Sequence, residues 1–255
     1  MAVSIKSNAE IQKMRIASSV LSDAISMLKK MIVPGVNCLD LDEQFYKFIK
    51  AKGCESNFKN YHGFPKTICI SINEQLVHGI PEDRILQDGD IVSVDTGCIF
   101  QGYHADSAFT MICGIAKNEK HDILIKVTEE CLELAIKEVK PGTRIGTIGY
   151  IIQSHAEKHG FGVPRDYTGH GIGTQMHEDP HIPNYGIYDT GMRLKAGMVI
   201  CIEPMIQIGT YKTKLASDNW TVLSADKSMA AHFEHTILVT DSGYEVLTKS
   251  KVKEL

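Results

Sequence analysis

Two aspartates lie in a stretch whose residue types predict a β-hairpin. The residues around Asp95 are mostly β-branched, and a turn that contains Gly102 separates them from a second apolar run. The midpoint between the two aspartates falls between Phe100 and Gln101. A regular hairpin centred there places Asp95 opposite Asp106, with side chains roughly 5 Å apart on one face. Two carboxylates that close repel each other unless a proton or a cation neutralises them.

Two glutamates repeat this arrangement later in the chain. Glu203 ends an apolar run that begins at Val199, and Glu234 opens another run of β-branched and apolar residues. Their midpoint falls between Asp218 and Asn219, a dipeptide that favours turns. Paired aspartates on strands are common without a metal, but packing does not require two such pairs. Four carboxylates in one site would need about two divalent cations to be tolerated.

The composition limits the class of protein. The chain has 255 residues, of which 43% are hydrophobic and 23% are charged, as in an ordinary globular domain. The net charge of −4 argues against a nucleic-acid-binding surface, and no run of about eighteen apolar residues predicts a membrane span. The seven cysteines form no Cys-x-x-Cys motif, and the N-terminus does not resemble a signal peptide. We therefore expect reduced thiols and a cytoplasmic location.

Helices and turns must hold these carboxylates in place, and their sequence signals occur in both parts of the chain. A capping box at Ser7–Glu10 opens a first helix, and further helices are expected near residues 39–52, near residues 117–138 and before Gly160. A strand is expected over Thr67–Ile72. A pair of helices thus precedes each predicted hairpin.

Short motifs also repeat at a nearly constant offset. Pro34-Gly35 recurs 107 residues later as Pro141-Gly142, and His62 in Tyr-His-Gly recurs 108 residues later as His170 in Gly-His-Gly. Internal repetition at one offset indicates a doubled architecture. We expect a single α+β domain made of two pseudo-symmetric halves, with the domain spanning residues 1–255 and the halves at about 10–113 and 117–240.

One histidine is a candidate for completing the ligand set. His170 lies in the glycine-rich segment Thr168–Gly173, where the flanking glycines permit close backbone approach. A lone loop histidine is more often a hydrogen-bonded structural residue. Four carboxylates and one imidazole form an oxygen-rich set that favours manganese, iron(II) or cobalt over structural zinc. Two such ions that share a water lower its pKa and supply hydroxide for hydrolysis at neutral pH.

Several motifs spread over nearly the whole chain carry a more specific signal. They are Tyr61-His62-Gly63-Phe64-Pro65-Lys66, Ser71-Ile72-Asn73-Glu74, His78-Gly79-Ile80-Pro81, Gly102-Tyr103-His104-Ala105-Asp106, Gly169-His170-Gly171-Ile172-Gly173, Ile202-Glu203-Pro204 and Phe233-Glu234-His235-Thr236. Together they resemble the type I methionine aminopeptidases, whose pita-bread fold is shared with prolidases and creatinase. The resemblance implies two pseudo-symmetric halves around a curved antiparallel sheet. It also implies an enzyme that hydrolyses the N-terminal methionine from nascent polypeptides whose second residue is small.

The resemblance assigns a role to each predicted ligand. By that likeness Asp95 chelates one metal, and Asp106 and Glu234 bridge both metals. His170 and Glu203 complete the shell of the second metal. A hydroxide that bridges the two divalent ions (cobalt, manganese or iron) is the nucleophile, and Glu203 also serves as its proton shuttle.

Two more histidines and an apolar slot take roles by the same likeness. His177 matches the position that donates to the scissile carbonyl oxygen, and His78 matches the position that contacts the substrate amide and assists protonation of the leaving group. Without the motif, each would more often be a structural histidine. A slot for an unbranched thioether is expected from the matching residues, each of which could instead be ordinary core: Tyr61, Phe64, Cys69, Met176 and Trp220, with Phe58 at the rim.

The chain departs from the family pattern around the slot and keeps every ligand. Phe58 stands where cysteine is common, Phe64 where tyrosine is frequent, and Met176 where phenylalanine is frequent. These changes bear on the size of the slot. His232 stands where glutamine is usual, and its position two residues before Glu234 predicts an effect on the metals. The family also often holds a monovalent cation through backbone carbonyls, at positions matched here by Asn73, Gln75 and Ala230.

Two alternatives remain open at this point. A proline-specific peptidase of the same fold usually carries a sizeable N-terminal domain, whereas the motifs begin almost at once here. A metal-free relative that binds peptides or acts as a chaperone would lose ligands, and this chain keeps all five. For the enzyme we expect a monomer that binds the N-terminal methionine of nascent peptides; contact with the ribosome would suit the activity but leaves no mark in the sequence.

Overall fold

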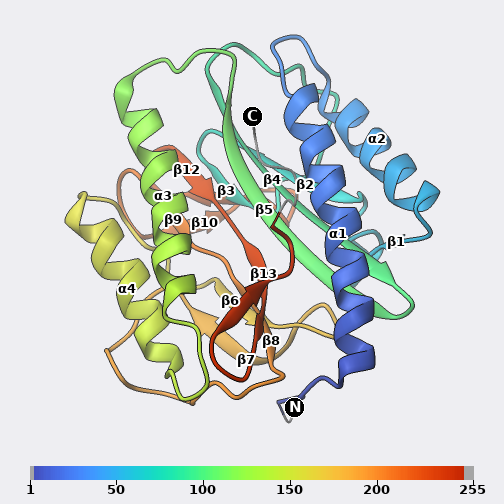
Figure 1. Cartoon of the computed structure of the whole chain (residues 1–255). Coiled ribbons are helices and arrows are strands. Elements are labelled where there is room, and N and C mark those ends of the chain that lie inside the picture. Colours follow the sequence, from blue (N-terminus) through green and yellow to red (C-terminus); the bar gives the residue numbers. More distant parts are fainter. Residues whose placement is uncertain (1–2, 250–255) are drawn as a thin grey trace.

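Two pairs of helices flank the strands in the computed structural model, which describes residues 3–249 (Figure 1). One pair comes from the first half of the chain and lies on the right of Figure 1, and the other comes from the second half and lies on the left. The four predicted helices are all present, with bounds close to the expected ones. They are α1 (Asn8–Met31), α2 (Cys38–Ala51), α3 (Glu119–Lys137) and α4 (Ile145–Lys158), with one short 3-10 helix, η1 (Tyr61–Gly63).

The strands pair in an antiparallel sense in every sheet of residues 3–249. They are β1 (Glu55–Ser56), β2 (Ile68–Ile72), β3 (Gln75–Val77), β4 (Asp90–Phe100), β5 (Tyr103–Cys113), β6 (Thr168–Gly171), β7 (Glu178–Pro183), β8 (Val199–Ile202), β9 (Met205–Gln207), β10 (Thr213–Leu215), β11 (Val222–Ser224), β12 (Ala230–His232), β13 (His235–Val239) and β14 (Tyr244–Val246). In the first half, β4 pairs with β5, β1 and β2. In the second half, the largest sheet has the order β14-β13-β8-β6-β7. Two smaller sheets have the orders β10-β11-β3 and β12-β9.

The helices begin where the sequence predicts, but their caps differ. The Glu10 carboxylate accepts from the Ser7 N–H at 2.7 Å while the Glu10 N–H donates to the Ser7 hydroxyl, which completes the predicted capping box of α1. Asn37 caps α2 through its side chain, which accepts from Leu39 N–H at 2.9 Å. Arg144, at the corresponding place before α4, makes no side-chain cap hydrogen bond.

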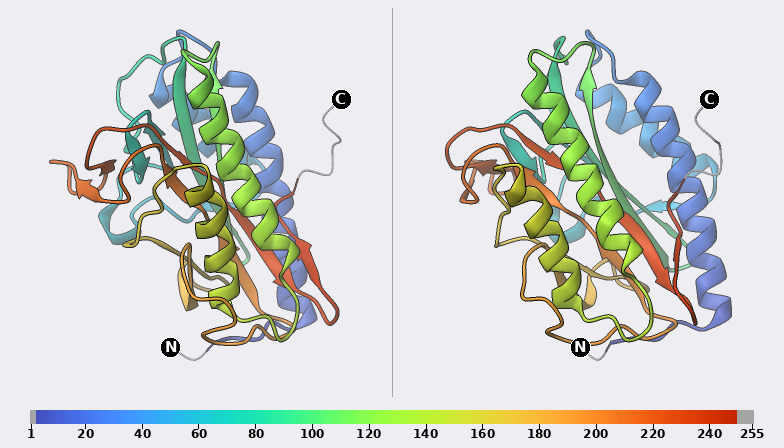
Figure 2. Two further views of the ribbon diagram at one scale, coloured as in Figure 1. Left: turned by 90° about the vertical axis from the view of Figure 1, so that its left-hand side faces the viewer. Right: turned by 60° about the vertical axis from the view of Figure 1, so that its left-hand side comes forward.

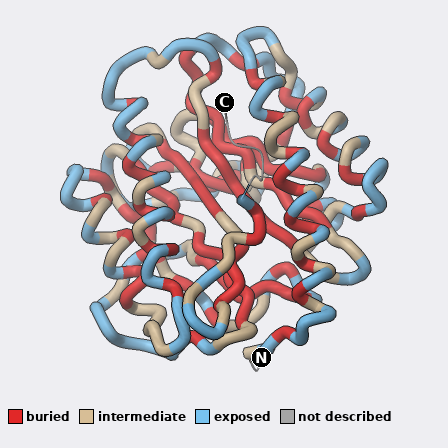
Figure 3. Tube along the Cα trace, in the orientation of Figure 1, coloured by how far each residue is buried: buried red, intermediate tan, exposed pale blue. Residues whose placement is uncertain are grey.

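One hydrophobic cluster joins both helix pairs to the strands. Leu28 of α1, Phe45 of α2, Leu124 of α3 and Ile148 of α4 are fully buried in it, together with Val92 of β4. Buried residues follow the strands, while exposed residues gather on loops and on the outer turns of helices (Figure 3). Figure 2 shows α3 and α4 side by side against the strands. Within residues 3–249, no helix has the length and apolar character needed to cross a membrane.

The first hairpin has a two-residue turn, Gln101-Gly102. Its centre therefore lies between these two residues, whereas the sequence predicted a centre between Phe100 and Gln101. Phe100 pairs with Tyr103 across this turn. The two turn residues have φ values of 48° and 80°. Positive φ at both positions is what a type I′ hairpin turn requires, and this tight turn sets the register of both strands.

This register changes the relation between the two aspartates. Asp95 pairs with Ala108, and Asp106 pairs with Gly97. The predicted direct pairing of the aspartates is therefore wrong by two residues, because the turn lies one residue further along the chain than expected. A shift by two residues keeps the same face, since side chains alternate with period two. The aspartates are diagonal neighbours on one face, still within reach of a common cation.

The second hairpin has the predicted centre. His235 pairs with Ile202, and the β9–β12 and β10–β11 ladders continue the same register around Asp218-Asn219. This register places Glu203 opposite Glu234, as the sequence predicts. Asn219 has a φ of 60°, consistent with its position in a tight turn.

The second hairpin is interrupted where the first is continuous. Glu203 and Pro204 separate β8 from β9, and Pro204 has no N–H to donate to a ladder. Phe233 N–H still donates to Pro204 O at 3.2 Å, so the two chains stay close across the break. The glutamates thus project from strand ends, not from strand interiors.

Candidate active site

All of the predicted site residues line one cavity of about 470 Å³. Both halves of the chain contribute to its wall. Residues that the sequence did not nominate also line it, among them Tyr167 and His181. The predicted residues found there are Phe58, Tyr61, Phe64, Cys69, His78, Asp95, Asp106, His170, Met176, His177, Glu203, Trp220 and Glu234.

Three carboxylates meet at one end of the cavity. Asp95, Asp106 and Glu234 each offer an oxygen that lies within 4.8 Å of the other two. Asp106 and Glu234 are 3% and 2% exposed. One oxygen of each of the three has no hydrogen-bond partner within residues 3–249. Buried carboxylate oxygens without donors are costly unless a cation accepts them, so this group fits a divalent metal.

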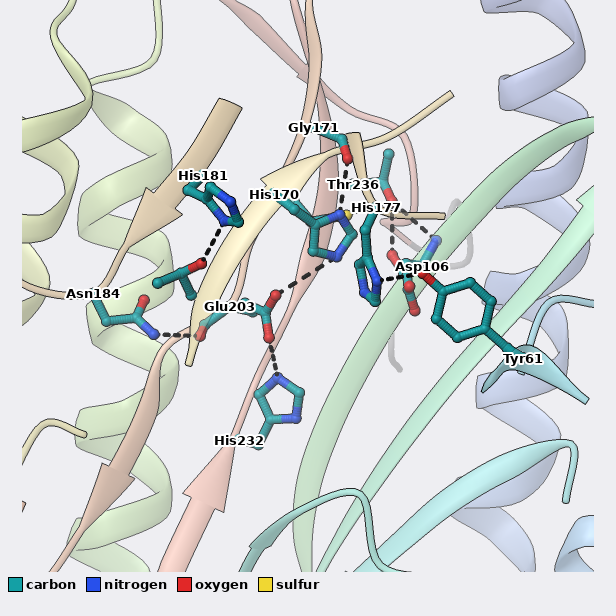
Figure 4. Close-up of polar contacts among 12 residues, drawn as sticks. Tyr61, Asp106, His170, Gly171, His177, His181, Asn184, Glu203, His232 and Thr236 are labelled. Carbon is teal, nitrogen blue, oxygen red and sulfur yellow. Dashed lines mark hydrogen bonds and ion pairs between the residues drawn. The ribbon is translucent and has the colours of Figure 1, made fainter. Parts of the chain in front are cut away.

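Glu203 lies between His170 and His232 (Figure 4). Its Oε1 is 3.6 Å from His170 Nε2, and its Oε2 is 3.5 Å from His232 Nε2. His232 is 2% exposed and its Nε2 has no hydrogen-bond partner among the described residues. His232 thus faces Glu203, whereas its sequence position had pointed to Glu234, and an effect of His232 on the metals stays a prediction.

Cys201 is a neighbour of this site that sequence reasoning missed. Its Sγ belongs to a second group of candidate ligand atoms within 4.8 Å of one another, with His170 and Glu234. The Sγ also lies 3.6 Å from the Thr236 hydroxyl. Cys201 precedes Glu203 by two residues in a strand run, and the period of two could have pointed to it.

Burial and mutual repulsion govern the protonation of the carboxylates. Burial, followed by the charges of Glu234 and Asp95, raises the pKa of Asp106 well above its usual value. Burial and the charge of Glu203 do the same to the pKa of Glu234. Burial raises the pKa of Asp95 to about 6. A cluster of this kind favours either bound protons or bound cations.

His170 has the protonation state that a metal ligand needs. Burial, with the nearby His177, lowers the pKa of His170 to about 3, so its ring is neutral at pH 7. Its Nδ1 lies 2.9 Å from Gly171 O, so Nδ1–H donates to that carbonyl and the lone pair of Nε2 remains free. A backbone acceptor on one ring nitrogen is the usual support of a metal-ligating histidine.

His78 and His177 lie at the same cavity and are also neutral. Burial lowers the pKa of His78 to about 4 and lowers the pKa of His177. His177 Nδ1 is 2.9 Å from the Tyr61 hydroxyl (Figure 4). His177 also packs edge-on against His170, with ring centroids 4.3 Å apart. Both imidazoles can donate one hydrogen bond to a ligand without carrying a charge.

An apolar slot forms the other end of the cavity. Phe58, Phe64, Cys69 and Met176 are buried in one cluster, with partly buried neighbours that include Trp220. The rings of Phe64 and Trp220 meet edge to face, with centroids 5.1 Å apart. The neighbours Tyr61 and Ile80 complete the cluster, and Ile80 was not nominated from the sequence.

The positions nominated for a monovalent cation lie partly together. Ala230 N–H donates to Asn73 O at 2.9 Å, so these two residues are neighbours. Gln75 is two residues from Asn73, in β3, and pairs with Leu223. The binding of a monovalent cation there stays a prediction.

Comparisons with known proteins agree with this geometry. The sequence model of metallopeptidase family M24 matches residues 12–241. The chain is 69% identical to a methionine aminopeptidase of Mycoplasma capricolum subsp. capricolum, over 98% of this chain and 99% of that protein. It is 46% identical to methionine aminopeptidase 1 of Bacillus subtilis, over 96% of this chain and 98% of that protein.

Solved structures give the same result for the fold. A methionine aminopeptidase of Thermotoga maritima superposes with a TM-score of 0.96 at 43% identity, over 98% of this chain and 100% of that one. A prolidase of Pyrococcus furiosus superposes with a TM-score of 0.79 at 26% identity, over 97% of this chain but 66% of the prolidase.

Proposed function

Because the chain belongs to metallopeptidase family M24, we propose that it is the aminopeptidase that removes an N-terminal methionine when the second residue is small. The fold is the α+β pita-bread fold that the motifs predict, as the superposed aminopeptidase and prolidase structures show. The observation that carries the proposal is the shared cavity. One end gathers buried carboxylates with unpaired oxygens, and the other end is an apolar slot.

Membership of the family implies the use of divalent metal. We assign two ions to the carboxylate cluster, with Asp95, Asp106 and Glu234 around the first. Asp106, Glu234, His170 and Glu203 would hold the second. The oxygen-rich set favours manganese, iron(II) or cobalt. When bound, two such cations lower the pKa of an associated water so that hydroxide is available near neutral pH.

The chain's own side chains then handle the protons. Burial and the charge of Asp95 raise the pKa of Glu203 well above its usual value, so its carboxyl accepts a proton more readily than that of an exposed glutamate. Its two carboxylate oxygens lie 3.6 Å from His170 Nε2 and 3.5 Å from His232 Nε2, within reach of proton exchange through the cavity. Glu203 is the proposed proton shuttle for this reason.

His177 is the proposed donor to the carbonyl oxygen of the scissile bond. A neutral imidazole carries a single N–H, and when the Tyr61 hydroxyl donates to Nδ1 the proton resides on Nε2. Nε2–H can then donate to the oxygen on which negative charge develops, which stabilises the transition state more than the ground state. His78, also neutral, is the proposed partner of the leaving amine.

Substrate choice follows from the two ends of the cavity. The slot around Phe64, Cys69 and Met176 suits an unbranched thioether, because polarisable sulfur and aromatic rings contact each other favourably. The free amine of a peptide carries a positive charge and would lie near the carboxylates. An internal peptide bond offers no such charge, which explains action at the N-terminus only.

The alternatives are not favoured. The prolidase superposition leaves about a third of that protein unmatched, whereas the methionine aminopeptidases match over nearly their full length. A metal-free binding protein would not need buried carboxylates with unpaired oxygens. We place the activity in the cytoplasm, since all seven cysteines are free thiols, and we expect a monomer acting on nascent peptides near the ribosome.

Metal removal tests the proposal. EDTA should abolish cleavage of a Met-Ala-Ser peptide, and Mn²⁺, Co²⁺ or Fe²⁺ should restore it, with released methionine measured by chromatography. N-acetyl-Met-Ala-Ser is the control that should stay intact, because it has no free amine. A purified chain that binds no divalent ion and cleaves no methionine-initiated peptide under any metal contradicts the proposal. Preferential cleavage of an Xaa-Pro dipeptide would support the proline-specific alternative instead.

A further inference from the structure

Glu178 is a charged residue that the reaction does not use, and it follows the proposed donor His177 in the chain. Its Oε2 lies 2.8 Å from Lys6 Nζ, and the side chains of Lys6 and Glu178 expose only 5% and 12% of their surface. Removing one partner of such a buried pair leaves an uncompensated charge, which is far more costly than losing a surface ion pair. The pair joins the start of the chain to the loop that carries His177.

Three donors converge on the Glu178 carboxylate. Besides Lys6, the Ser4 hydroxyl donates to Oε2 at 2.7 Å, and Gln175 N–H donates to Oε1 at 3.1 Å. Burial would raise the pKa of Glu178, but the hydrogen bonds from Lys6, Ser4 and Gln175 hold it below its usual value. Glu178 is therefore an anion held from several sides.

The lysine is itself anchored. Lys6 N–H donates to Gly197 O at 2.8 Å, just before β8 begins. Ser7, the next residue, caps α1. The N-terminal arm, residues 3–7, is thus fixed both to α1 and to the segment that leads into the strand before Glu203.

The loop that precedes Glu178 closes around the ion pair. Gly173 N–H donates to Gln175 O at 3.1 Å, and His104 N–H donates to Gly173 O at 2.9 Å. A Cβ on Gly173 would lie 2.6 Å from Glu178 Oε1 and 2.6 Å from Lys6 Cε, so a side chain at this position would displace the ends of the ion pair. The backbone at Gln175 and at Glu178 is tied to one carboxylate, and the two residues between them include His177.

We propose that Lys6 positions His177 for the proposed reaction by holding Glu178. The inference rests on the proposed function, because the readout is the turnover that His177 promotes. Lys6 touches no substrate. It fixes the ends of the short segment whose imidazole contacts Tyr61 at 2.9 Å, and a donor must stay within a few tenths of an ångström of its productive place.

The first test is Lys6→Met in the metal-loaded, full-length enzyme. With Met-Ala-Ser as substrate, kcat should fall about tenfold while KM changes less than about twofold, because His177 acts on charge that develops in the transition state. Bound metal, measured by elemental analysis, should be unchanged. Arg15→Met is the control: it removes another ion pair of the N-terminal region, Arg15–Glu245 at 2.6 Å, and should leave kcat unchanged.

Two double variants separate positioning from general destabilisation. In a His177→Ala background, Lys6→Met should cause no further fall in kcat, since residues that act as one unit are not additive. The double variant Lys6→Met/Glu178→Gln should have a kcat at least about threefold higher than that of Lys6→Met alone. The reason is that removing both charges avoids an unpaired buried carboxylate. Should Lys6→Met fail to fold, Glu178→Gln alone serves for the same His177-dependence test.

Failure of the positioning role of Lys6 and failure of the proposed function would give different results. If Lys6→Met lowers kcat equally in the wild-type and His177→Ala backgrounds, or changes it no more than Arg15→Met does, Lys6 has no positioning role. If the wild-type chain cleaves no methionine-initiated peptide, the proposed function fails instead, and with it the role given to His177.

Discussion

The two hairpins that carry the carboxylates hold them in different ways. In the first, β4 and β5 pair along all 11 residues of each strand, and Asp95 and Asp106 project from strand interiors. In the second, the ladder breaks at Pro204, and Glu203 and Glu234 lie in the gap. The ladder register directs both aspartate side chains, whereas Glu203 lies outside a ladder and its backbone carbonyl accepts from the Asn184 side-chain N–H at 2.8 Å.

This difference shows how unequal halves of a chain can supply one centre. A continuous ladder fixes the direction of each side chain, so the short aspartate side chain is sufficient there. A break releases the backbone from the ladder, and contacts from other segments must then hold it. The second hairpin therefore depends more on contacts between distant residues than the first does.

The largest expected effect comes from removing one of the carboxylates that we propose as metal ligands, from either half. Asp106→Asn and Glu234→Gln should each lower turnover by more than about a hundredfold, since even the partners of metal ligands cost about 10–100-fold. The same variants should raise the Tm of the metal-free protein, because each removes repulsion within a buried carboxylate cluster. Peptide turnover and calorimetry on EDTA-treated protein measure the two effects.

Asp241→Asn, at an exposed position, is the matched control and should change neither quantity. Wild-type-like turnover in one of the variants Asp106→Asn and Glu234→Gln would mean that only the other hairpin holds metal. The two hairpins would then resemble each other in structure but would not both bind metal.

His177, from the second half, should show the next largest effect. His177→Ala should lower kcat about a hundredfold with little change in KM, the scale for losing one oxyanion donor. Tyr61→Phe should lower kcat roughly tenfold, because the first half then no longer sets the tautomer of His177. Steady-state kinetics at saturating metal measure both, and an unchanged kcat in His177→Ala removes this residue from the mechanism.

The helix caps provide a smaller contrast between the halves. Asn37→Ala should cost about 1 kcal/mol of the free energy of unfolding, because the α2 cap loses its side-chain acceptor. Arg144→Ala, before α4, loses no cap but does lose the exposed hydrogen bond from Arg144 Nη1–H to Gly191 O at 2.6 Å, which should cost about 0.5 kcal/mol. Denaturant midpoints at constant m-value measure the difference. Equal losses of unfolding free energy in the two variants would show that the Asn37 side-chain cap adds no stability of its own to α2.

The smallest effect is a dependence on pH at the capping box of α1. Hydrogen bonds from the Ser7 hydroxyl and backbone lower the pKa of Glu10 to about 2 from its usual value near 4.5. A lowered folded-state pKa adds stability above the unfolded value, and that stability is lost as the pH falls toward 2. The stability difference between wild type and Glu10→Gln should therefore be constant above about pH 5 and shrink below pH 4.5. A difference that does not vary between pH 5 and pH 3, measured by denaturant unfolding, contradicts this account.

Local signals in the sequence were sufficient for much of the fold. The capping box at Ser7 and Glu10, the Pro-Gly stops and the turn at Asp218-Asn219 act over a few residues, so they could be recognised without knowing the packing. The carboxylate spacing around that turn also predicted the register of the second hairpin. Motif matches nominated the residues that line the cavity.

The first hairpin shows where local signals were insufficient. The sequence indicated a turn containing Gly102 but not that Gln101 would also adopt a positive φ of 48°. A non-glycine residue rarely does so, and the choice depends on how the strands twist against their neighbours. The face of the aspartates was right because a shift by two residues preserves it, while their direct pairing was wrong.

The sequence by itself determined which residue types could form a metal-binding hydrolytic site and which face of each strand they occupy, because spacing along one strand or helix has a fixed geometry. Tertiary structure alone decided which residues from distant parts of the chain contact them. Lys6 meets Glu178 across 172 positions of the chain, and Tyr61 meets His177 across 116. Such contacts depend on how whole elements pack, and side-chain periodicity, which describes only one element at a time, carries no information about them.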